Sequence, residues 1–232
     1  MLRTLMLCFG SLLATSTLHA QHVSLGVKAG LNASTYGGGD VPNPRFRLGP
    51  AAGVLVRLKL GPYLDLQPEV LYEQRGARTS YKIPFDYYAS AYAFTHQERS
   101  RLHDVSLAVL LRLHRAKWFV VAGPQVSHLL AAQRRVTQAS QLLAGPLDPR
   151  VAVGPTSTTI RGVYNYHRWN LGYAVGVGYQ VAARVGVELR YAASFTQVQQ
   201  PRLDPDILPV PRAVLARNRV VQTQLNYQLS RR

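Results

Sequence analysis

The sequence predicts an all-β fold, an eight-stranded antiparallel up-and-down transmembrane β-barrel, and two observations lead to it. Apolar residues recur at every second position in separate segments of the chain, and short and long connections alternate between those segments. A period of two is the pattern of a strand whose two faces meet different surroundings. The composition agrees, because 18 Gly, 14 Pro and 13 Tyr among 232 residues favour strands and turns.

Eight segments carry this alternation. In the sixth, Trp169, Leu171 and Tyr173 begin one apolar face, whereas Asn170 and Gly172 begin the opposite face. The eight segments lie near residues 22–32, 47–59, 63–77, 102–113, 118–131, 169–181, 184–194 and 221–229.

The connections between the segments favour a membrane barrel. Residues 60–62, 114–117 and 182–183 are tight turns, whereas the remaining connections, near 33–46, 78–101, 132–166 and 195–217, are long. Outer-membrane barrels have short periplasmic turns at one rim and long extracellular loops at the other. The main structural alternative is a soluble periplasmic lipocalin-like barrel, in which apolar residues such as Val175 and Val177 would point inward.

The first twenty residues have the pattern of a secretory signal. Arg3 precedes an apolar stretch from Leu5 to Ala14, and small and polar residues follow to Ala20. Residues 1–20 are therefore predicted to be a signal peptide, and residues 21–232 a barrel domain in the outer membrane. An uncleaved anchor helix is the alternative, but the stretch is short for a membrane span. Because Cys8 is the only cysteine, the mature chain has no disulfide and no cysteine-ligated zinc.

The polar faces of the predicted strands carry charged residues of both signs. Eight strands enclose a space that side chains fill, and buried charges require partners. We therefore expect Glu69 and Glu188 to meet basic residues across the interior, which would be a packed polar core and not a pore. A substrate-binding cluster is the alternative. The predicted network consists of Lys28, Arg57, Glu69, Arg75, Arg112, Glu188 and Arg190.

The net charge of +16 comes mainly from arginine, since only four of the 27 basic residues are lysine. Arginine binds phosphate in a bidentate manner, and an exported chain does not meet nucleic acid. We expect outer-membrane lipid and lipopolysaccharide to be partners, with Arg134, Arg135 and Arg168 contacting lipopolysaccharide phosphates. The alternative is that these arginines only form a solvated surface.

The sequence predicts no catalytic, cofactor-binding or metal-binding residues. The histidines lack metal-ligand spacing. Ser127 and His128 are neighbours, but adjacent residues of a strand point to opposite faces, so they cannot act as a nucleophile and its base.

Several short motifs resemble the PorT-like family of outer-membrane β-barrel proteins. They are GVKAGLN at residues 26–32, LQPEVLY with QRG at 66–76, AGPQVS at 122–127, GVGY at 176–179 and VELRY at 187–191. The resemblance implies an eight-stranded barrel inserted by the outer-membrane assembly machinery, without catalytic residues. Some family members assist an outer-membrane protein-secretion system. The C-terminus departs from the usual aromatic ending, because Leu229 is followed by Ser230, Arg231 and Arg232.

Three functions follow from these expectations. The first is a structural role or an interaction through the loops. The second is that of an accessory component of a secretion system, with an envelope or secretion-system protein as partner. The third is that of a barrel enzyme that modifies lipid A.

Overall fold

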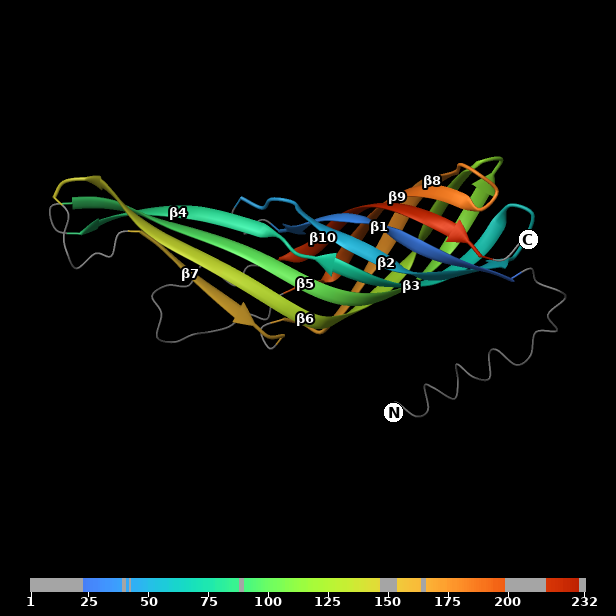
Figure 1. The fold of residues 1–232 in the computed structure, drawn as a ribbon, viewed down its shortest axis with the longest axis horizontal. Coiled ribbons are helices and arrows are strands. Elements are labelled where there is room, and N and C mark those ends of the chain that lie inside the picture. Colours follow the sequence, from blue (N-terminus) through green and yellow to red (C-terminus); the bar gives the residue numbers. More distant parts are fainter. Residues whose placement is uncertain are drawn as a thin grey trace, which may run out of the picture.

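In a computed structural model, the described residues of the chain form one antiparallel β-sheet of ten strands (Figure 1). The structure describes residues 23–38, 41, 43–87, 90–146, 154–163, 166–198 and 216–229, so the predicted signal peptide lies outside the described residues. The strands are β1 (Val23–Gly37), β2 (Arg47–Lys59), β3 (Leu64–Arg75), β4 (Arg78–Tyr87), β5 (Ser90–Arg115), β6 (Trp118–Ala144), β7 (Gly154–Arg161), β8 (Trp169–Gln180), β9 (Val185–Gln197) and β10 (Arg217–Gln228). The described parts of the chain contain no helix with the length and hydropathy of a membrane span.

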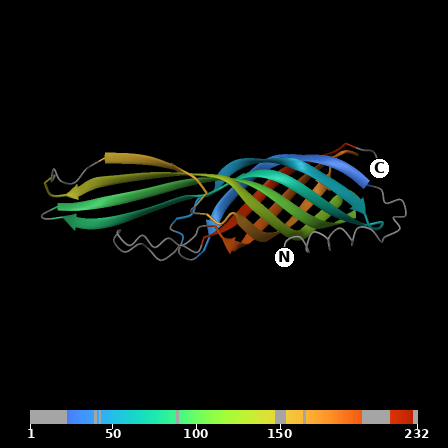
Figure 2. The ribbon, with the colours of Figure 1, turned by 90° about the horizontal axis from the view of Figure 1, so that it is seen from below.

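Strand pairing closes the sheet into a ring with an extension. The ring runs in the order β5, β3, β2, β1, β10, β9, β8 and β6, and the pairing of β5 with β6 closes it. β4 and β7 lie outside the ring, where they pair with the far parts of β5 and β6. Figure 2 shows the ring as a barrel and the extension as a long ribbon leaving one end of it.

The extension corrects the prediction that residues 78–101 and 132–166 are long loops, and it adds two described strands, β4 and β7, to the eight of the ring. β5 and β6 contain 26 and 27 residues, and only the parts after Arg101 and before Gln133 belong to the ring. The outer parts alternate poorly in the sequence because both of their faces are largely polar. The outer parts of β5 and β6 are held together by the backbone hydrogen bonds of their long antiparallel pairing.

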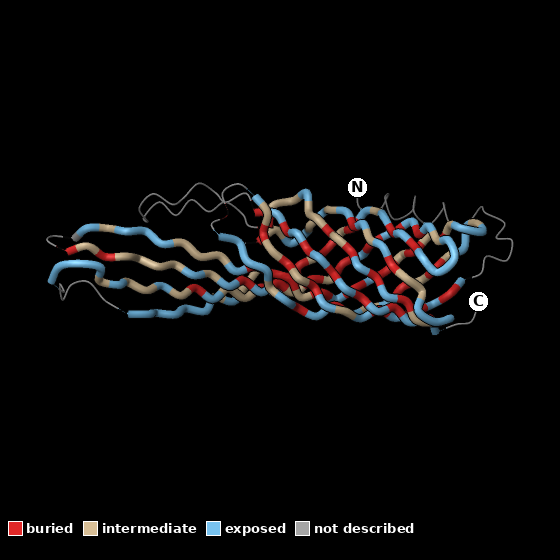
Figure 3. The backbone as a smooth tube through the Cα atoms, turned by 90° about the horizontal axis from the view of Figure 1, so that it is seen from above, coloured by how far each residue is buried: buried red, intermediate tan, exposed pale blue. Residues whose placement is uncertain are grey.

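The two faces of the ring differ in polarity as the alternation predicts. β10 alternates between exposed and buried along its whole length, and the buried positions are mostly polar. Figure 3 shows the same alternation as stripes around the barrel. Val175 and Val177 are 43% and 42% exposed. The soluble-barrel alternative, which would bury both, therefore does not match the observed arrangement.

An apolar cluster fills the end of the ring that faces the extension. Its residues come from the ends of strands and from the segments that connect them: Tyr36, Val41, Ala77, Leu102, Leu129, Ala132, Tyr166, Val198 and Ala216. The hydroxyl groups of Tyr36 and Ser100 lie 2.6 Å apart within this end. At the opposite end, tight turns join β2 to β3, β5 to β6 and β8 to β9. The polar interior therefore lies below an apolar cap.

Candidate functional site

Four charged side chains from three strands meet in the interior of the ring. Lys28 of β1 donates to Glu69 of β3 at 2.8 Å and to Glu188 of β9 at 3.1 Å. Arg190 of β9 donates to Glu188 at 2.7 Å and forms a bidentate pair with Glu69. All four side chains are almost completely buried. Two cations therefore balance two carboxylates, as a buried cluster requires.

These contacts cross the ring instead of following its wall. β1 is separated from β3 by β2 and from β9 by β10, so Lys28 reaches over a neighbouring strand on each side. The contact between Glu69 and Arg190 passes over three intervening strands. Side chains that touch across the interior leave no open channel at this level.

A second cluster lies nearer the apolar cap, around the carboxylate of Glu73. This carboxylate accepts hydrogen bonds from Arg75, from the hydroxyl of Ser106 at 2.8 Å and from the amide of Gln222. Arg75 also lies 4.0 Å from Asp104. The structure thus pairs Arg75 with acids of its own cluster, separately from Lys28 and Arg190.

The remaining predicted residues lie toward the rim with the tight turns. Arg112 donates to Asp65 at 3.0 Å. Arg57 donates to the side-chain oxygens of Gln67 and Asn226 at 3.0 and 2.9 Å. The seven predicted residues are therefore distributed over three levels of one polar interior. The amide side chains of Gln67 and Asn226 lie outside the predicted network, although both residues occupy buried polar positions of their strands.

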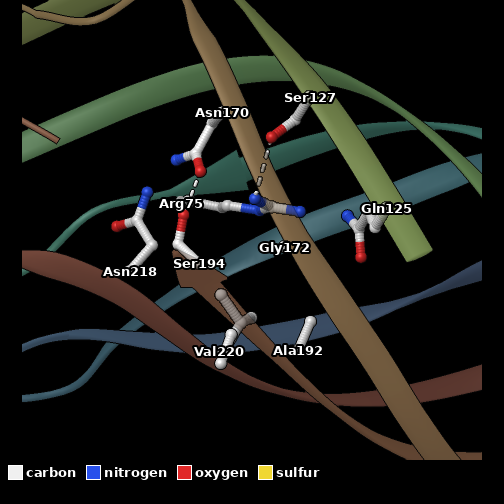
Figure 4. Close-up of a pocket in the computed structure, with 10 residues that line it drawn as sticks. Arg75, Gln125, Ser127, Asn170, Gly172, Ala192, Ser194, Asn218 and Val220 are labelled. Carbon is white, nitrogen blue, oxygen red and sulfur yellow. Dashed lines mark hydrogen bonds between the residues drawn. The ribbon is translucent and has the colours of Figure 1, made fainter. Parts of the chain in front are cut away.

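A small cavity lies between the second cluster and the apolar cap (Figure 4). Arg75 extends into it and donates to Ser127 at 3.4 Å, and Ser194 donates to Asn170 on the other side. The cavity volume is about 10 Å³, which corresponds to roughly one water molecule. The Nε atom of Arg75 and the Oδ1 atom of Asn218 have no hydrogen-bond partner within the described residues, although Nε of Arg75 lies 4.0 Å from Asp104. The cavity suits one bridging water and is too small for an organic substrate.

The site offers no arrangement of catalytic groups around Ser127. The side chain of Ser127 is buried inside the barrel. The imidazole of His128 lies on the outer face of the barrel, with its centroid 4.6 Å from that of the Trp169 indole. The two residues cannot act as nucleophile and base, because they point to opposite faces of β6. Among the described residues, no group of three or more histidine, cysteine or acidic side chains has a geometry suited to a metal ion.

The three arginines predicted to contact lipopolysaccharide do not form one group. Arg134 and Arg135 are adjacent in β6, so their side chains leave opposite faces of the extension. Arg134 lies 3.8 Å from Glu98, whereas Arg135 is exposed and lies directly opposite Arg99 of β5. Arg168 is exposed in the segment that precedes β8.

Comparison with known proteins gives the family. Residues 19–200 match the family described as outer membrane protein beta-barrel domain. The chain belongs to this family. Membership supports an outer-membrane location for the barrel. A comparison with curated proteins finds no match.

Two solved structures are similar in outline. Neisserial surface protein A has 12% sequence identity and a TM-score of 0.45, with 89% of this chain and 99% of that chain covered. Ail, the attachment invasion locus protein of Yersinia pestis, has 9% identity and a TM-score of 0.37, with 89% of this chain and 98% of that chain covered. Similarity at this level does not bear on function.

Proposed function

We propose that this protein is an integral outer-membrane barrel of eight membrane-spanning strands, exported by its signal peptide, which holds the extension of β4 to β7 outside the cell as an interaction surface. The observation that carries the proposal is the reversed polarity of the ring, with charges inside and aliphatic side chains outside. A soluble barrel buries its aliphatic face, whereas a membrane barrel turns that face to lipid.

The length of the apolar face supports this placement. On β5, the outward side chains from Val105 to Leu113 are aliphatic at every second position. These nine residues span roughly 27 Å at about 3.4 Å per residue, close to the length of a membrane-spanning strand. The next outward residue is His103, and its ring lies beside that of Tyr72 on β3. Amphipathic rings of this kind favour the interface between lipid and water.

The filled interior supports a structural or binding role in place of transport. The contacts of Glu69 and Arg190 cross the ring, and the apolar cluster at its end covers the polar interior. We infer that the protein does not conduct solutes and that its role is non-enzymatic. In the extension, β4 pairs with the outer part of β5, β5 pairs with β6, and β6 pairs with β7. This four-stranded part of the molecule is the part available to other molecules.

The first experiment is electrophoresis of the protein after refolding in detergent, with and without boiling. We expect the unboiled sample to migrate differently from the boiled one, and refolding to require detergent. Refolding to a monomer in plain buffer would contradict the proposal.

A pair of variants tests the outward face directly. Leu189 is 52% exposed in the middle of β9, and Leu60 is 49% exposed at a turn. We expect Leu189→Arg to destabilise the refolded protein by about 2–4 kcal/mol, the cost of arginine on a lipid-facing strand near the bilayer centre. Leu60→Arg is the matched control and should have little effect. Equal tolerance of both changes would indicate a water-exposed face.

A PorT-like role as accessory of a secretion system is the second candidate. Besides the sequence motifs, the outer edges of β4 and β7 favour it, because neither edge pairs with another described strand, apart from the single bridge between Arg78 of β4 and Arg45. Such edges can accept a strand from a partner. Deletion of the protein should then leave cargo proteins inside the cell, and normal export would exclude this role.

A further inference from the structure

Arginines form a continuous row across the outward face of the extension. Arg99 of β5 lies directly opposite Arg78 of β4 on one side and opposite Arg135 of β6 on the other. Arg78 also forms an isolated bridge with Arg45. Residues directly opposite each other in antiparallel strands share a face of the sheet. Four arginine side chains therefore leave one face side by side, with neighbouring strands about 4.8 Å apart.

A second, shorter row lies closer to the ring. Arg101 of β5 lies opposite Gln133 of β6, which lies opposite Arg161 of β7. The outward face thus carries two rows of arginine within two residue positions of one another. The six arginines, all exposed, are Arg45, Arg78, Arg99, Arg101, Arg135 and Arg161. We call this set the arginine rows.

The arginine rows have no carboxylate partner in the described part of the chain. Its salt bridges include none of the six residues, and the nearby Glu98 leaves the opposite face of β5, where it meets Arg134. Like charges placed directly opposite each other destabilise a sheet. Because this destabilisation recurs between several neighbouring strands, we infer that an anion neutralises the arginines when the protein is in the cell envelope.

The position of the arginine rows identifies the anion. Along β5 the outward side chains change from aliphatic at Val105 to His103, then to Arg101 and Arg99, and then to Gln97. The outward face of the extension continues the aliphatic face of the ring without a change of side. Each step of two residues advances about 7 Å along the strand. Arginines one and two steps beyond the aromatic level lie at the depth of lipid headgroups.

We propose that the arginine rows bind the phosphate groups of a phosphorylated lipid in the outer leaflet, with lipid A as the ligand and its acyl chains against the aliphatic face of the ring. The planar guanidinium fork suits phosphate oxygens in a bidentate manner. A lipid supplies both the anion and the apolar surface below it, whereas a soluble polyanion supplies only the anion. This inference rests on the outer-membrane placement proposed above.

Binding of radiolabelled lipid A to the refolded protein in detergent tests the proposal. The variant Arg78→Gln/Arg99→Gln/Arg135→Gln removes three charges from the arginine rows. The matched control, Lys59→Gln/Arg115→Gln/Lys117→Gln, removes three exposed charges at the rim with the tight turns. We expect the first variant to weaken binding on the order of tenfold or more, since each basic group near a charged lipid surface contributes to attraction. The control should bind as the unchanged protein does.

Two further ligands separate the sources of phosphate. Lipid A stripped of its phosphates should bind the unchanged protein as weakly as intact lipid A binds the arginine variant. Inorganic phosphate at the same phosphate concentration should not displace lipid A, and displacement would overturn the lipid as ligand. Equal losses in the arginine variant and the control would also overturn the proposal.

The same protein preparations distinguish a failure of the phosphate site from a failure of the membrane placement. All variants are first checked for a heat-dependent shift on gels. A protein that refolds without detergent contradicts the membrane placement itself. A protein that shifts normally, but binds lipid A equally well with and without the three arginines, contradicts only the phosphate site.

Discussion

Glu69 of β3 and Arg190 of β9 form a bidentate ion pair across the ring, although three other strands lie between β3 and β9 along the barrel wall. Lys28 and Glu188 complete the cluster, so that each cation contacts both carboxylates. Because the four groups come from opposite sides of the barrel, the cluster fixes the cross-section of the interior as well as its net charge.

Removal of one charged residue from this cluster should leave a buried opposite charge without its ion-pair partner. We expect Glu69→Gln to lower the free energy of unfolding by about 3–5 kcal/mol, the usual effect of breaking one side of a buried ion pair. Denaturant titration in detergent, followed by tryptophan fluorescence, measures the change. Lys59→Gln, which removes an exposed charge, is the control and should change the value little.

The double variant Lys28→Met/Glu69→Gln tests the charge balance itself. It leaves Glu188 and Arg190, which contact each other directly. We expect this double variant to be less destabilised than the sum of its two single variants, because a balanced pair remains. Additive losses would show that the four groups do not act as one cluster.

Gly178 provides a test of packing on the inner wall. The aromatic ring of Phe119 on β6 covers Gly178 on β8, and a Cβ atom at this position would overlap the ring. We expect Gly178→Ala to destabilise the barrel by about 1–3 kcal/mol, the cost of overpacking. Gly61→Ala is the matched control, because a Cβ atom there meets no atom within 4 Å. Equal stability of the two variants would contradict the close contact with Phe119.

The turn between β5 and β6 contains a residue in an unfavourable backbone conformation. Ala116 has a φ of 54°, which costs a residue with a Cβ atom about 1–2 kcal/mol. Glycine adopts this conformation freely but loses more entropy on folding. We therefore expect Ala116→Gly to raise the free energy of unfolding by about 0.5 kcal/mol in the same titration. A loss of stability would show that other contacts of the turn dominate.

The strands of the ring could be predicted from the sequence, because one face of each strand is exposed and apolar and the other is buried and largely polar. From Val105 to Leu113 the alternation is complete, and the face of each charged interior residue followed from it. From Thr95 to Arg99 every residue is polar on both faces of β5, so the sequence of the extension shows no clear period. The partner of a given charge also could not be predicted, because the contact of Glu69 with Arg190 depends on how the ring closes.

The arginine rows depend on register in the same way. An extra residue, Leu130, enters β6 between the partners of Asp104 and His103. This bulge shifts the alternation, so that Arg135, and not Arg134, faces outward with Arg99. Without the positions of bulges, a sequence shows only that the two arginines leave opposite faces.

Acidification should loosen the hairpin of β4 and β5 within the extension. The ring of His96 stacks on that of Tyr81 at 4.8 Å, and partial burial lowers the pKa of His96 below its ordinary value of 6.5, while Arg134 lowers it further and Glu98 opposes the shift. The folded state therefore binds this proton less readily than the unfolded state. Stability from His96 is present above about pH 6.5 and falls as the pH decreases through and below that value.

Hydrogen exchange at pH 7.5 and pH 5 measures this dependence. We expect the amides of β4 to lose protection at the lower pH, and a titration of His96 by NMR to show a midpoint below 6.5. His96→Phe keeps an aromatic ring beside Tyr81 but cannot be protonated, so it should remove most of the pH dependence. Should His96→Phe lose protection to the same extent at pH 5, the effect belongs to other groups, of which Glu98 and its contact with Arg134 are the nearest.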